Sequence, residues 1–120
     1  NKNLKSYIYI ENLLNLLSIC IEHPKAGNNI FVCSDNKNIS TAELLTNLYK
    51  GMHNKNYLIR FPQFLLKSSS YCIGKGDLYK KLSCTLTTDN RKAYKMLGWY
   101  PQIDISTALR KVANDYISTI

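Results

Sequence analysis

The hydrophobic positions of the chain recur with two different spacings, and these predict a mixture of helices and short strands. From Glu11 to His23 the apolar residues follow helical spacing, and Pro24 ends that segment. The same reasoning predicts further helices at residues 41–50, 63–74, 91–97 and from about 104 to about 118. Short runs of β-branched and aromatic residues predict strands at residues 7–10, 29–33, 57–61 and 84–88, the second of them buried.

Local signals at the helix ends support these boundaries. Ser40-Thr-Ala-Glu43 is a capping box, in which the Ser hydroxyl accepts a free helix amide and the Glu carboxylate reaches back. The helix that follows is expected to end at Gly51. Asp89 is placed to cap the helix of residues 91–97. Gly98 then ends that helix and lets Trp99, the single tryptophan, turn into the core.

The chain reads as one unit. Neither a repeat nor a low-complexity linker interrupts residues 1–120. The expected fold class is α/β in the broad sense, a mixed α+β arrangement of short strands and several helices, with too few strands for a doubly wound sheet of its own. The first residues lack a methionine and a signal-peptide core and lead at once into a predicted strand, so we expect an interior piece of a longer protein.

The net charge of +8 raises the question of nucleic-acid binding. The 13 lysines and three arginines are scattered, however, and form no basic stripe or recognition motif. Asparagine is as abundant as lysine, which is typical of an AT-biased genome rather than of a selected binding surface. A nucleic-acid partner is therefore not expected, although a small basic nucleic-acid-binding domain remains the remote alternative. Apolar runs are too short for a membrane span, so no membrane insertion is expected.

The four cysteines are at positions 20, 33, 72 and 84. They have no C-x-x-C spacing and no histidine at ligand spacing, so no metal site is expected. Each lies in an apolar segment, where a thiol behaves as a small hydrophobe. We therefore expect buried free thiols and a cytoplasmic location.

Two patterns imitate parts of a dehydrogenase site. Tyr71 and Lys75 have the Tyr-x-x-x-Lys spacing of a general acid/base pair, but Gly74 and Gly76 end the helix that such a pair requires. The alternative is a purely structural one, in which Lys75 lies at the carboxyl end of the helix predicted at residues 63–74, where a cation interacts favourably with the helix dipole. Gly74-Lys-Gly76 lacks the third glycine of a dinucleotide loop, and the element before it is helical.

The histidines offer no catalytic constellation. His23 and His53 lie near predicted helix exits, where an imidazolium interacts favourably with the helix dipole, and no carboxylate or nucleophile is placed to partner them. Nucleophile-elbow, zincin and Walker-type motifs are not found in the sequence. We predict no catalytic residue in this chain.

An ordered set of motifs nevertheless resembles one family along nearly the full length. Asn3-Leu-Lys-Ser-Tyr-Ile-Tyr-Ile-Glu-Asn-Leu13 is similar to the Asn-x-Arg-Ser-Phe-Val-x-Val-Asp-Asn-Leu stretch of extended short-chain dehydrogenases/reductases, the NAD-dependent epimerase/dehydratase family. Further family motifs follow in order: His23-Pro-Lys-Ala-Gly27, Ile30-Phe-Val-Cys-Ser-Asp35, Ile39-Ser-Thr-Ala-Glu-Leu-Leu45, Phe61-Pro62, Leu82-Ser-Cys-Thr-Leu86 and Leu97-Gly-Trp-Tyr-Pro101. The branch that is most similar comprises UDP-sugar 4-epimerases and 4-keto-reductases of bacterial surface-polysaccharide synthesis.

The resemblance implies that the chain is the C-terminal substrate-binding portion of such an enzyme. In the family, an N-terminal Rossmann domain binds NAD(H) and supplies the catalytic residues, and that domain is absent from these 120 residues. The parent would move a hydride at C4 of a UDP-sugar through a 4-keto intermediate, and the fragment alone would be inactive and hold no cofactor. A homodimeric parent is a further expectation, since family members pair through helices of the N-terminal part.

The resemblance also points to three substrate-binding residues. Lys5 and Lys81 stand where the family has arginines, the second of which clamps the UDP diphosphate. Lysine keeps the charge but lacks the planar fork that fits phosphate at two points. Leu86 stands where epimerases place a residue that lines the sugar pocket. Solvated surface charge is the alternative for both lysines.

Two other functions therefore stay open beside the epimerase or dehydratase. One is a UDP-4-keto-sugar reductase of O-antigen synthesis, which shares the cofactor and the substrate class. The other is a non-catalytic relative that binds nucleotide sugars and has lost the diphosphate clamp, an idea motivated by the two lysines.

Overall fold

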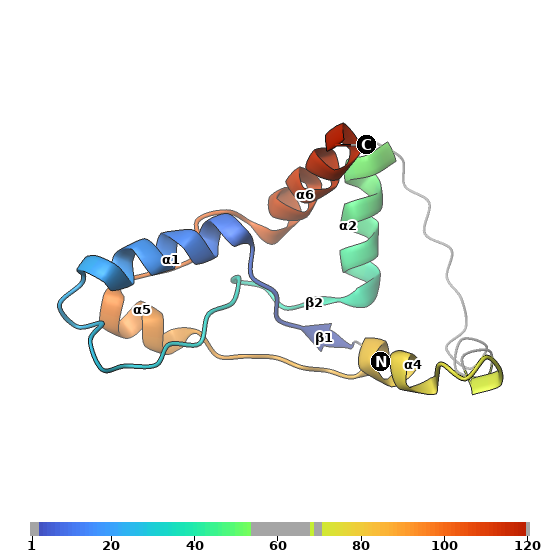
Figure 1. Ribbon diagram of the computed structural model, residues 1–120, viewed down its shortest axis with the longest axis horizontal. Coiled ribbons are helices and arrows are strands. Elements are labelled where there is room, and N and C mark those ends of the chain that lie inside the picture. Colours follow the sequence, from blue (N-terminus) through green and yellow to red (C-terminus); the bar gives the residue numbers. More distant parts are fainter. Residues whose placement is uncertain (1–2, 54–67, 69–70, 120) are drawn as a thin grey trace.

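The computed structural model describes residues 3–53, 68 and 71–119, and it confirms a mixed α/β arrangement with a very small sheet. In chain order these residues form β1 (Leu4–Lys5), α1 (Ile10–Glu22), β2 (Ile39–Ser40), α2 (Thr41–His53), α4 (Gly76–Ser83), α5 (Arg91–Leu97) and α6 (Ile105–Thr119). Helices α1 and α5 lie together at one end of the molecule, α2 and α6 form a second pair, and α4 lies apart from both (Figure 1). The molecule is elongated, 53 × 31 × 22 Å. None of the described helices has the length and apolar character needed to cross a lipid bilayer.

The small sheet is centred on β1. It pairs antiparallel with β2, so that Leu4 lies opposite Ser40 and Lys5 opposite Ile39. On its other side β1 meets Leu86: the Ser6 amide donates to the Leu86 carbonyl at 3.0 Å, and the Leu86 amide donates to the Leu4 carbonyl at 2.9 Å. The extended segment predicted at residues 84–88 is therefore present as a single bridge at Leu86 rather than as a strand.

Two other strand predictions are wrong. Residues 7–9 precede α1 without joining a strand, and Ile10 is already helical. Residues 29–33, predicted as a buried strand, have no strand partner among the described residues, and Ile30 is 83% exposed. Strand propensity is expressed only when a neighbouring strand supplies hydrogen bonds, and the described residues place none beside this segment. The strand predicted at 57–61 lies outside the described residues. Of the helix predicted at 63–74, residues 68 and 71–74 are described: 68, 71 and 72 are helical, and 73 and 74 form a turn.

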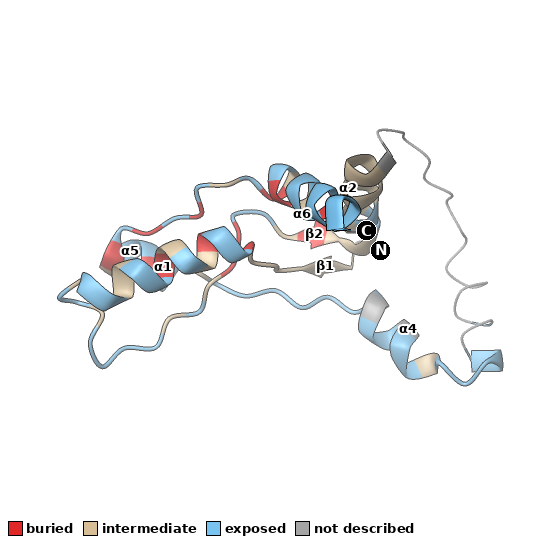
Figure 2. Cartoon of the chain, turned by 45° about the horizontal axis from the view of Figure 1, so that its top comes forward, coloured by how far each residue is buried: buried red, intermediate tan, exposed pale blue. Residues whose placement is uncertain are grey.

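The main core lies between α1 and α5. Leu16 of α1 packs with Ala93, Leu97 and Trp99 in one buried cluster. Gly98 has a φ of 66°, the left-handed conformation that a glycine adopts without strain, and it turns the chain so that the indole enters the core. Trp99 is 2% exposed, which confirms the prediction from the sequence. Figure 2 shows the buried residues concentrated on α1, α5 and the start of α6, whereas α4 is largely exposed.

The backbones of helices α2 and α6 approach each other closely at Gly51. A Cβ atom at Gly51 would lie 2.6 Å from the Ala113 Cβ and 3.1 Å from the backbone of Arg110. Glycine at this position therefore permits a close approach of the two helix backbones. The sequence predicted that Gly51 ends α2, and this is wrong, because the helix continues to His53.

A buried polar cluster links α1 to the start of α6. The Asn12 side-chain amide donates to Asp35 Oδ1 at 2.8 Å and to the Ile103 carbonyl at 3.0 Å, and Asn12 Oδ1 accepts the Ile103 amide at 3.1 Å. Asp35 Oδ2 accepts the Tyr9 amide at 3.1 Å. Burial raises the pKa of the Asp35 carboxyl, and the hydrogen bonds from Asn12 and from the Tyr9 amide oppose that rise.

The predicted capping box is present, whereas the N-cap position of α5 is Asn90 and Asp89, one residue earlier, accepts the first amide of that helix. The Glu43 amide donates to Ser40 Oγ at 3.2 Å, and the Ser40 amide donates to Glu43 Oε2 at 2.9 Å. The second bond is the main reason why the pKa of Glu43 is below its usual value. At the start of α5, Asp89 Oδ1 accepts the Arg91 amide at 2.9 Å, and the neighbouring Arg91 guanidinium lowers the pKa of Asp89 to about 2.

Replacing Ser40 by Ala is expected to lower the free energy of unfolding by about 1 kcal/mol, because one amide of the first turn of α2 loses its acceptor. Urea unfolding followed by circular dichroism measures the change. Ser18→Ala on α1 is the matched control, since its hydroxyl is exposed and donates to the Leu14 carbonyl within the same helix. Equal losses in the two variants would contradict a capping role for Ser40.

Candidate functional site

The three predicted substrate-binding residues lie at one corner of the molecule. Lys5 is in β1, Lys81 is in the last turn of α4 and Leu86 follows that helix. Lys5 is bridged to Leu86 through the backbone, and its ammonium group donates to the Lys81 carbonyl. We call Lys5, Lys81 and Leu86 the β1–α4 corner. The structure thus brings together residues that are up to 81 positions apart in the sequence, whereas their role in binding remains a prediction.

Helix α4 was not predicted from the sequence, because residues 76–83 were interpreted as a polar stretch leading into the extended segment at 84–88. Its eight residues begin with Asp77 in the first turn and end with Lys80 and Lys81 in the last turn, which is the charge order that the helix dipole favours. That charge order was the signal available in the sequence. It was hidden by Gly76 at the start and by the short length of the helix.

Lys5 stabilises the carboxyl end of α4. Its ammonium group lies against the Lys81 carbonyl, which has no intrahelical partner because the helix ends there. A cation at this end of a helix is favourable, so Lys5 has a structural role besides any role in binding. The Cys84 amide also stabilises this end of α4, because it donates to the Lys80 carbonyl at 3.0 Å.

Lys81 is the cation of the corner that is free to bind an anion. Its side chain is exposed and makes no ion pair with a described residue. Leu86, 69% exposed, presents an apolar surface three residues after the helix end. The corner therefore combines an available ammonium group, a second ammonium held against the helix end and an exposed aliphatic side chain. Such a set fits a ligand that has a phosphate group joined to a less polar ring.

The segment after α4 is held in place by side-chain hydrogen bonds to β1. Thr85 Oγ1 accepts the Leu4 amide at 3.2 Å, and Ser6 Oγ accepts the Thr88 amide at 2.8 Å. Together with the backbone bonds at Leu86, these hold the backbone of Leu86 beside β1 and therefore beside Lys5.

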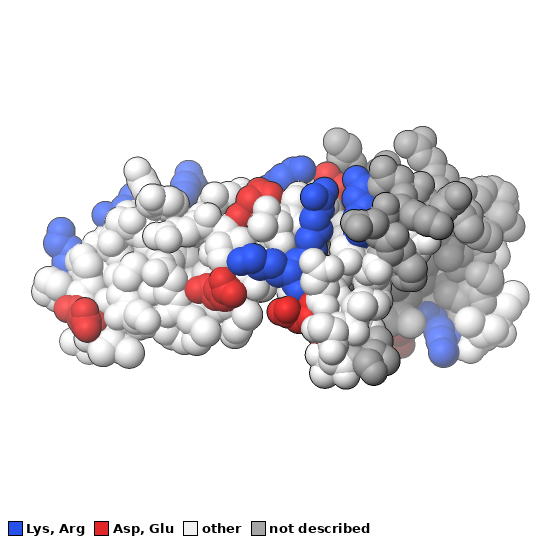
Figure 3. All heavy atoms as spheres, turned by 90° about the horizontal axis from the view of Figure 1, so that it is seen from above, with Lys and Arg blue, Asp and Glu red and all other residues white. Residues whose placement is uncertain are grey.

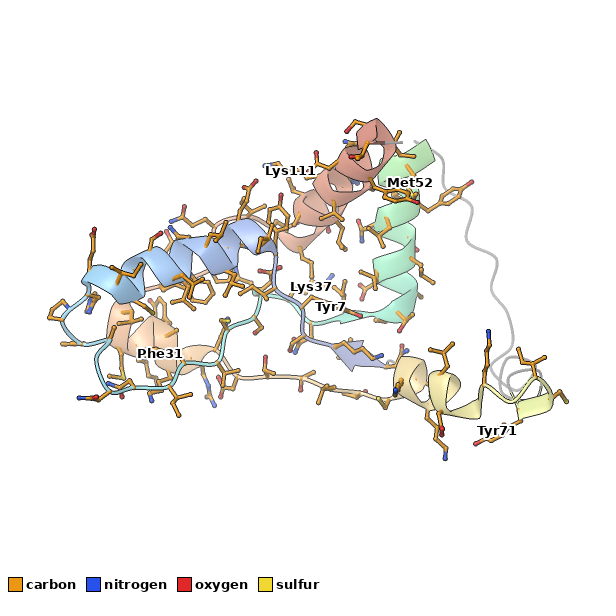
Figure 4. The ribbon with its side chains drawn as sticks, in the orientation of Figure 1. Tyr7, Phe31, Lys37, Met52, Tyr71 and Lys111 are labelled. Carbon is orange, nitrogen blue, oxygen red and sulfur yellow. The ribbon has the colours of Figure 1, made fainter. Side chains whose placement is uncertain are left out.

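The Tyr71 and Lys75 pair does not form an acid/base site. Gly74 has a φ of 73°, so the chain leaves the helix between the two residues. The Tyr71 ring instead lies against Gly76, where a Cβ would be 2.7 Å from it, and it is exposed far from the α1–α5 core (Figure 4). Lys75 follows the helical turn at residues 71 and 72 and so lies near its carboxyl end, in agreement with the interpretation from the sequence, and it also stands directly before α4.

The remaining candidate groups also have structural explanations. His23 caps the end of α1, where its Nδ1 accepts the Lys25 amide at 3.1 Å, and His53 is the last residue of α2.

Cys72 and Cys84 are exposed, so the expectation that all four thiols are buried is wrong. No group of three or more His, Cys, Asp or Glu side chains that could hold a metal ion occurs within residues 3–53, 68 and 71–119. On the face shown in Figure 3 basic and acidic side chains are interspersed.

Comparisons with known proteins give one similarity. Neither a family model nor a solved structure matches the chain. A curated protein of Vibrio cholerae named UDP-glucose 4-epimerase is 30% identical over 116 residues, which are 97% of this chain and 35% of that protein. The chain therefore spans about a third of the length of the curated relative that it matches. Along almost all of its length, this chain is similar to one part of a UDP-glucose 4-epimerase.

Proposed function

We propose that the chain is the C-terminal substrate-binding portion of a longer NAD-dependent enzyme that acts at C4 of a UDP-sugar. The observation that carries this is the β1–α4 corner, because three positions chosen from two motifs, one near the start of the chain and one at residues 81–86, come together in the fold. The similarity to a UDP-glucose 4-epimerase over 97% of the chain supports the same substrate class. Epimerase or dehydratase is the reaction that we favour, and a 4-keto-sugar reductase of O-antigen synthesis is the alternative.

In this proposal Lys81 pairs with the diphosphate of the UDP-sugar. Its ammonium group is exposed and has three donors, so it can approach one phosphate oxygen closely, although it cannot form the two parallel bonds of a guanidinium. Lys5 is half-buried and fixed at the end of α4, so it adds positive potential rather than a movable ligand. Leu86 packs against the sugar or the uracil ring. The chain thus binds and orients the substrate, and the chemical groups come from elsewhere in the parent.

The described residues do not fit NAD(H). Gly74-Lys-Gly76 joins a helical turn to α4, whereas a pyrophosphate loop joins a strand to a helix. Tyr71 and Lys75 are separated by the break at Gly74 and cannot act as the pair that the cofactor requires. We therefore assign cofactor binding to the part of the parent protein that has no counterpart in this chain, and no turnover is expected from the chain alone.

Replacing Lys81 by Ala is expected to weaken UDP binding about tenfold, because a hydrogen bond to a charged group contributes about 1.5 kcal/mol or more. Isothermal titration calorimetry with UDP measures the dissociation constant. Lys80→Ala is the matched control, since Lys80 is exposed in the same helical turn but is not part of the β1–α4 corner. Unchanged affinity in Lys81→Ala, or equal losses in both variants, would remove Lys81 from the site.

A further inference from the structure

The hydroxyl of Ser6 joins three segments of the chain at one point. Ser6 directly follows Lys5, the last residue of β1. Its Oγ donates to Asn38 Oδ1 at 2.6 Å and accepts the Thr88 amide at 2.8 Å. Asn38 directly precedes β2, and Thr88 lies in the segment that leads away from α4. One half-buried side chain therefore links β1 to a neighbouring segment on each side.

The contact at Thr88 continues a strand pairing that the backbone leaves incomplete. Lys5 and Leu86 form a parallel bridge. The Leu86 amide donates to the Leu4 carbonyl, and the Ser6 amide donates to the Leu86 carbonyl. A regular parallel ladder would go on with the Thr88 amide donating to the Ser6 carbonyl. The Ser6 hydroxyl accepts that amide instead, so a side chain supplies the next link of the pairing.

Asn38 sets the direction in which the Ser6 hydroxyl acts. A serine hydroxyl has one hydrogen to donate and lone pairs that accept. Because the hydrogen is directed to Asn38 Oδ1, a lone pair of Oγ remains for the Thr88 amide. Hydrogen bonds that are chained in this way strengthen one another. The link between the segment before β2 and the segment after α4 therefore depends on both side chains.

This link affects the β1–α4 corner, because the segment after α4 contains Leu86 and is continuous with Lys81. Helix α4 lies apart from the two helix pairs and is largely exposed (Figures 1 and 2). Hydrogen bonds hold its carboxyl end and the residues after it to β1, one from the Lys5 ammonium and others at residues 85, 86 and 88. The bond at Thr88 closes this contact beyond Leu86, so the backbone of Leu86 is held on both sides of the bridge.

We propose that Ser6 is a positioning residue of the substrate site, whose hydroxyl places Lys81 and Leu86 for binding the diphosphate and ring of a nucleotide sugar. The role is indirect, because Ser6 acts through the residues that it positions and does not contact the ligand. The inference rests on the proposed function, since it assigns to Ser6 a task in that same site. Binding groups that are held in place before the ligand arrives lose less freedom on binding, and this raises affinity.

Titration of the full 120-residue chain with UDP tests this role. Ser6→Ala is expected to weaken UDP binding about fivefold, because the hydrogen bonds that hold the site in place are lost. Ser6→Thr keeps the hydroxyl and suits an extended backbone, so its dissociation constant should stay within about twofold of that of the unaltered chain. Thr46→Ala is the matched control, since it removes a hydroxyl that donates to the Ala42 carbonyl at 2.7 Å within α2. That variant should bind UDP like the unaltered chain.

A double-mutant cycle separates positioning from a merely structural role. In the Lys81→Ala background, Ser6→Ala should cause less than about a twofold further loss of UDP affinity, because the cation that Ser6 positions is already missing. Hydrogen exchange should show a Thr88 amide that exchanges at least about tenfold faster in Ser6→Ala than in the unaltered chain. If circular dichroism shows that Ser6→Ala is unfolded, Asn38→Ala takes its place. Its expected loss of UDP affinity is about threefold, because it removes one of the two bonds of the hydroxyl.

Unchanged UDP affinity in Ser6→Ala together with a faster Thr88 amide would overturn the proposal, because the bond would then be lost without any effect on the site. Equal losses in Ser6→Ala and Thr46→Ala, or no recovery in Ser6→Thr, would also overturn it. An undiminished loss in the Lys81→Ala background would mean that Ser6 acts independently of Lys81, which contradicts a positioning role.

Failure of the proposed function gives a different result. An unaltered chain that binds no UDP, or a Lys81→Ala variant with unchanged affinity, would refute the substrate site itself and with it the role of Ser6. A chain whose UDP affinity falls in Lys81→Ala but not in Ser6→Ala would refute the role of Ser6 alone.

Discussion

Replacing Trp99 by Ala is expected to lower the free energy of unfolding by about 3–5 kcal/mol, a large part of the total for a chain of this size. The indole is the largest side chain of a core cluster that contains only three other buried residues. Removing it leaves a cavity between α1 and α5 that neither helix can close without losing its other contacts. We expect the α1–α5 end of the molecule to lose its fixed packing.

Two controls separate cavity formation from other causes. Trp99→Phe should cost clearly less, because the indole Nε1 has no hydrogen-bond partner among the described residues and only part of the volume is lost. Tyr100→Ala, at the next position but 56% exposed, should stay within about 0.5 kcal/mol of the parent chain. Urea unfolding followed by far-ultraviolet circular dichroism applies to all three variants. If Trp99→Ala and Tyr100→Ala cost the same, the indole does not organise this core.

Replacing Asn12 by Ala is the second large effect, about 3 kcal/mol, because it leaves several buried polar groups without partners. Asp35 loses one of its two donors, and the amide and carbonyl of Ile103 lose the side chain that satisfied both. The cluster joins α1 to the segment that leads into α6. We therefore expect the contact between these two parts of the molecule to loosen together with the loss of stability.

The pH dependence of the stability loss in Asn12→Ala shows whether the Asp35 carboxylate is its cause. The pKa of Asp35 is raised by burial above its ordinary value of 3.8, so its ionised form is less stable in the folded chain than in the unfolded chain. This contribution to stability is favourable at low pH and is lost as the pH rises through the folded pKa. Without the Asn12 amide the pKa rises further, so Asn12→Ala should cost more at neutral pH than at about pH 4.

Chemical unfolding at several pH values measures this difference. Asn36→Ala is the control, since Asn36 is exposed and, among the residues that the structure describes, its side chain donates to the Pro101 carbonyl alone, at 3.5 Å. A loss in Asn12→Ala that is the same at every pH would mean that packing, rather than the Asp35 carboxylate, accounts for it.

Features that depend on neighbouring residues were predictable from the sequence. The capping box at Ser40 and the turn at Gly98 each involve side chains within a few positions of one another, so local pattern and chemistry determine them. The same holds for the helical spacing of α1, which was predicted to within one residue at each end. Burial of Trp99 followed from the turn at Gly98.

Features that depend on distant residues were not predictable from periodicity. Residues 29–33 have a strand-like sequence, but no strand lies beside them within the described chain. Helix α4 is short, and its carboxyl end is stabilised by Lys5, 76 residues earlier. Asn12 is satisfied by Ile103, 91 residues later. Proximity of the members of the β1–α4 corner could be expected only from the order of the family motifs, not from their spacing.

The contact at Gly51 gives the candidate site a remote dependence on side-chain size. Helix α2 follows β2 without an intervening residue, and β2 is the strand that pairs with Lys5. Any larger residue at position 51 would force α2 away from Ala113, and the displaced helix would carry β2 with it. Position 51 therefore acts as a spacer between α2 and α6, and in an engineered variant its volume would be a means of shifting β2, and with it the strand that contains Lys5, without altering any residue of the corner.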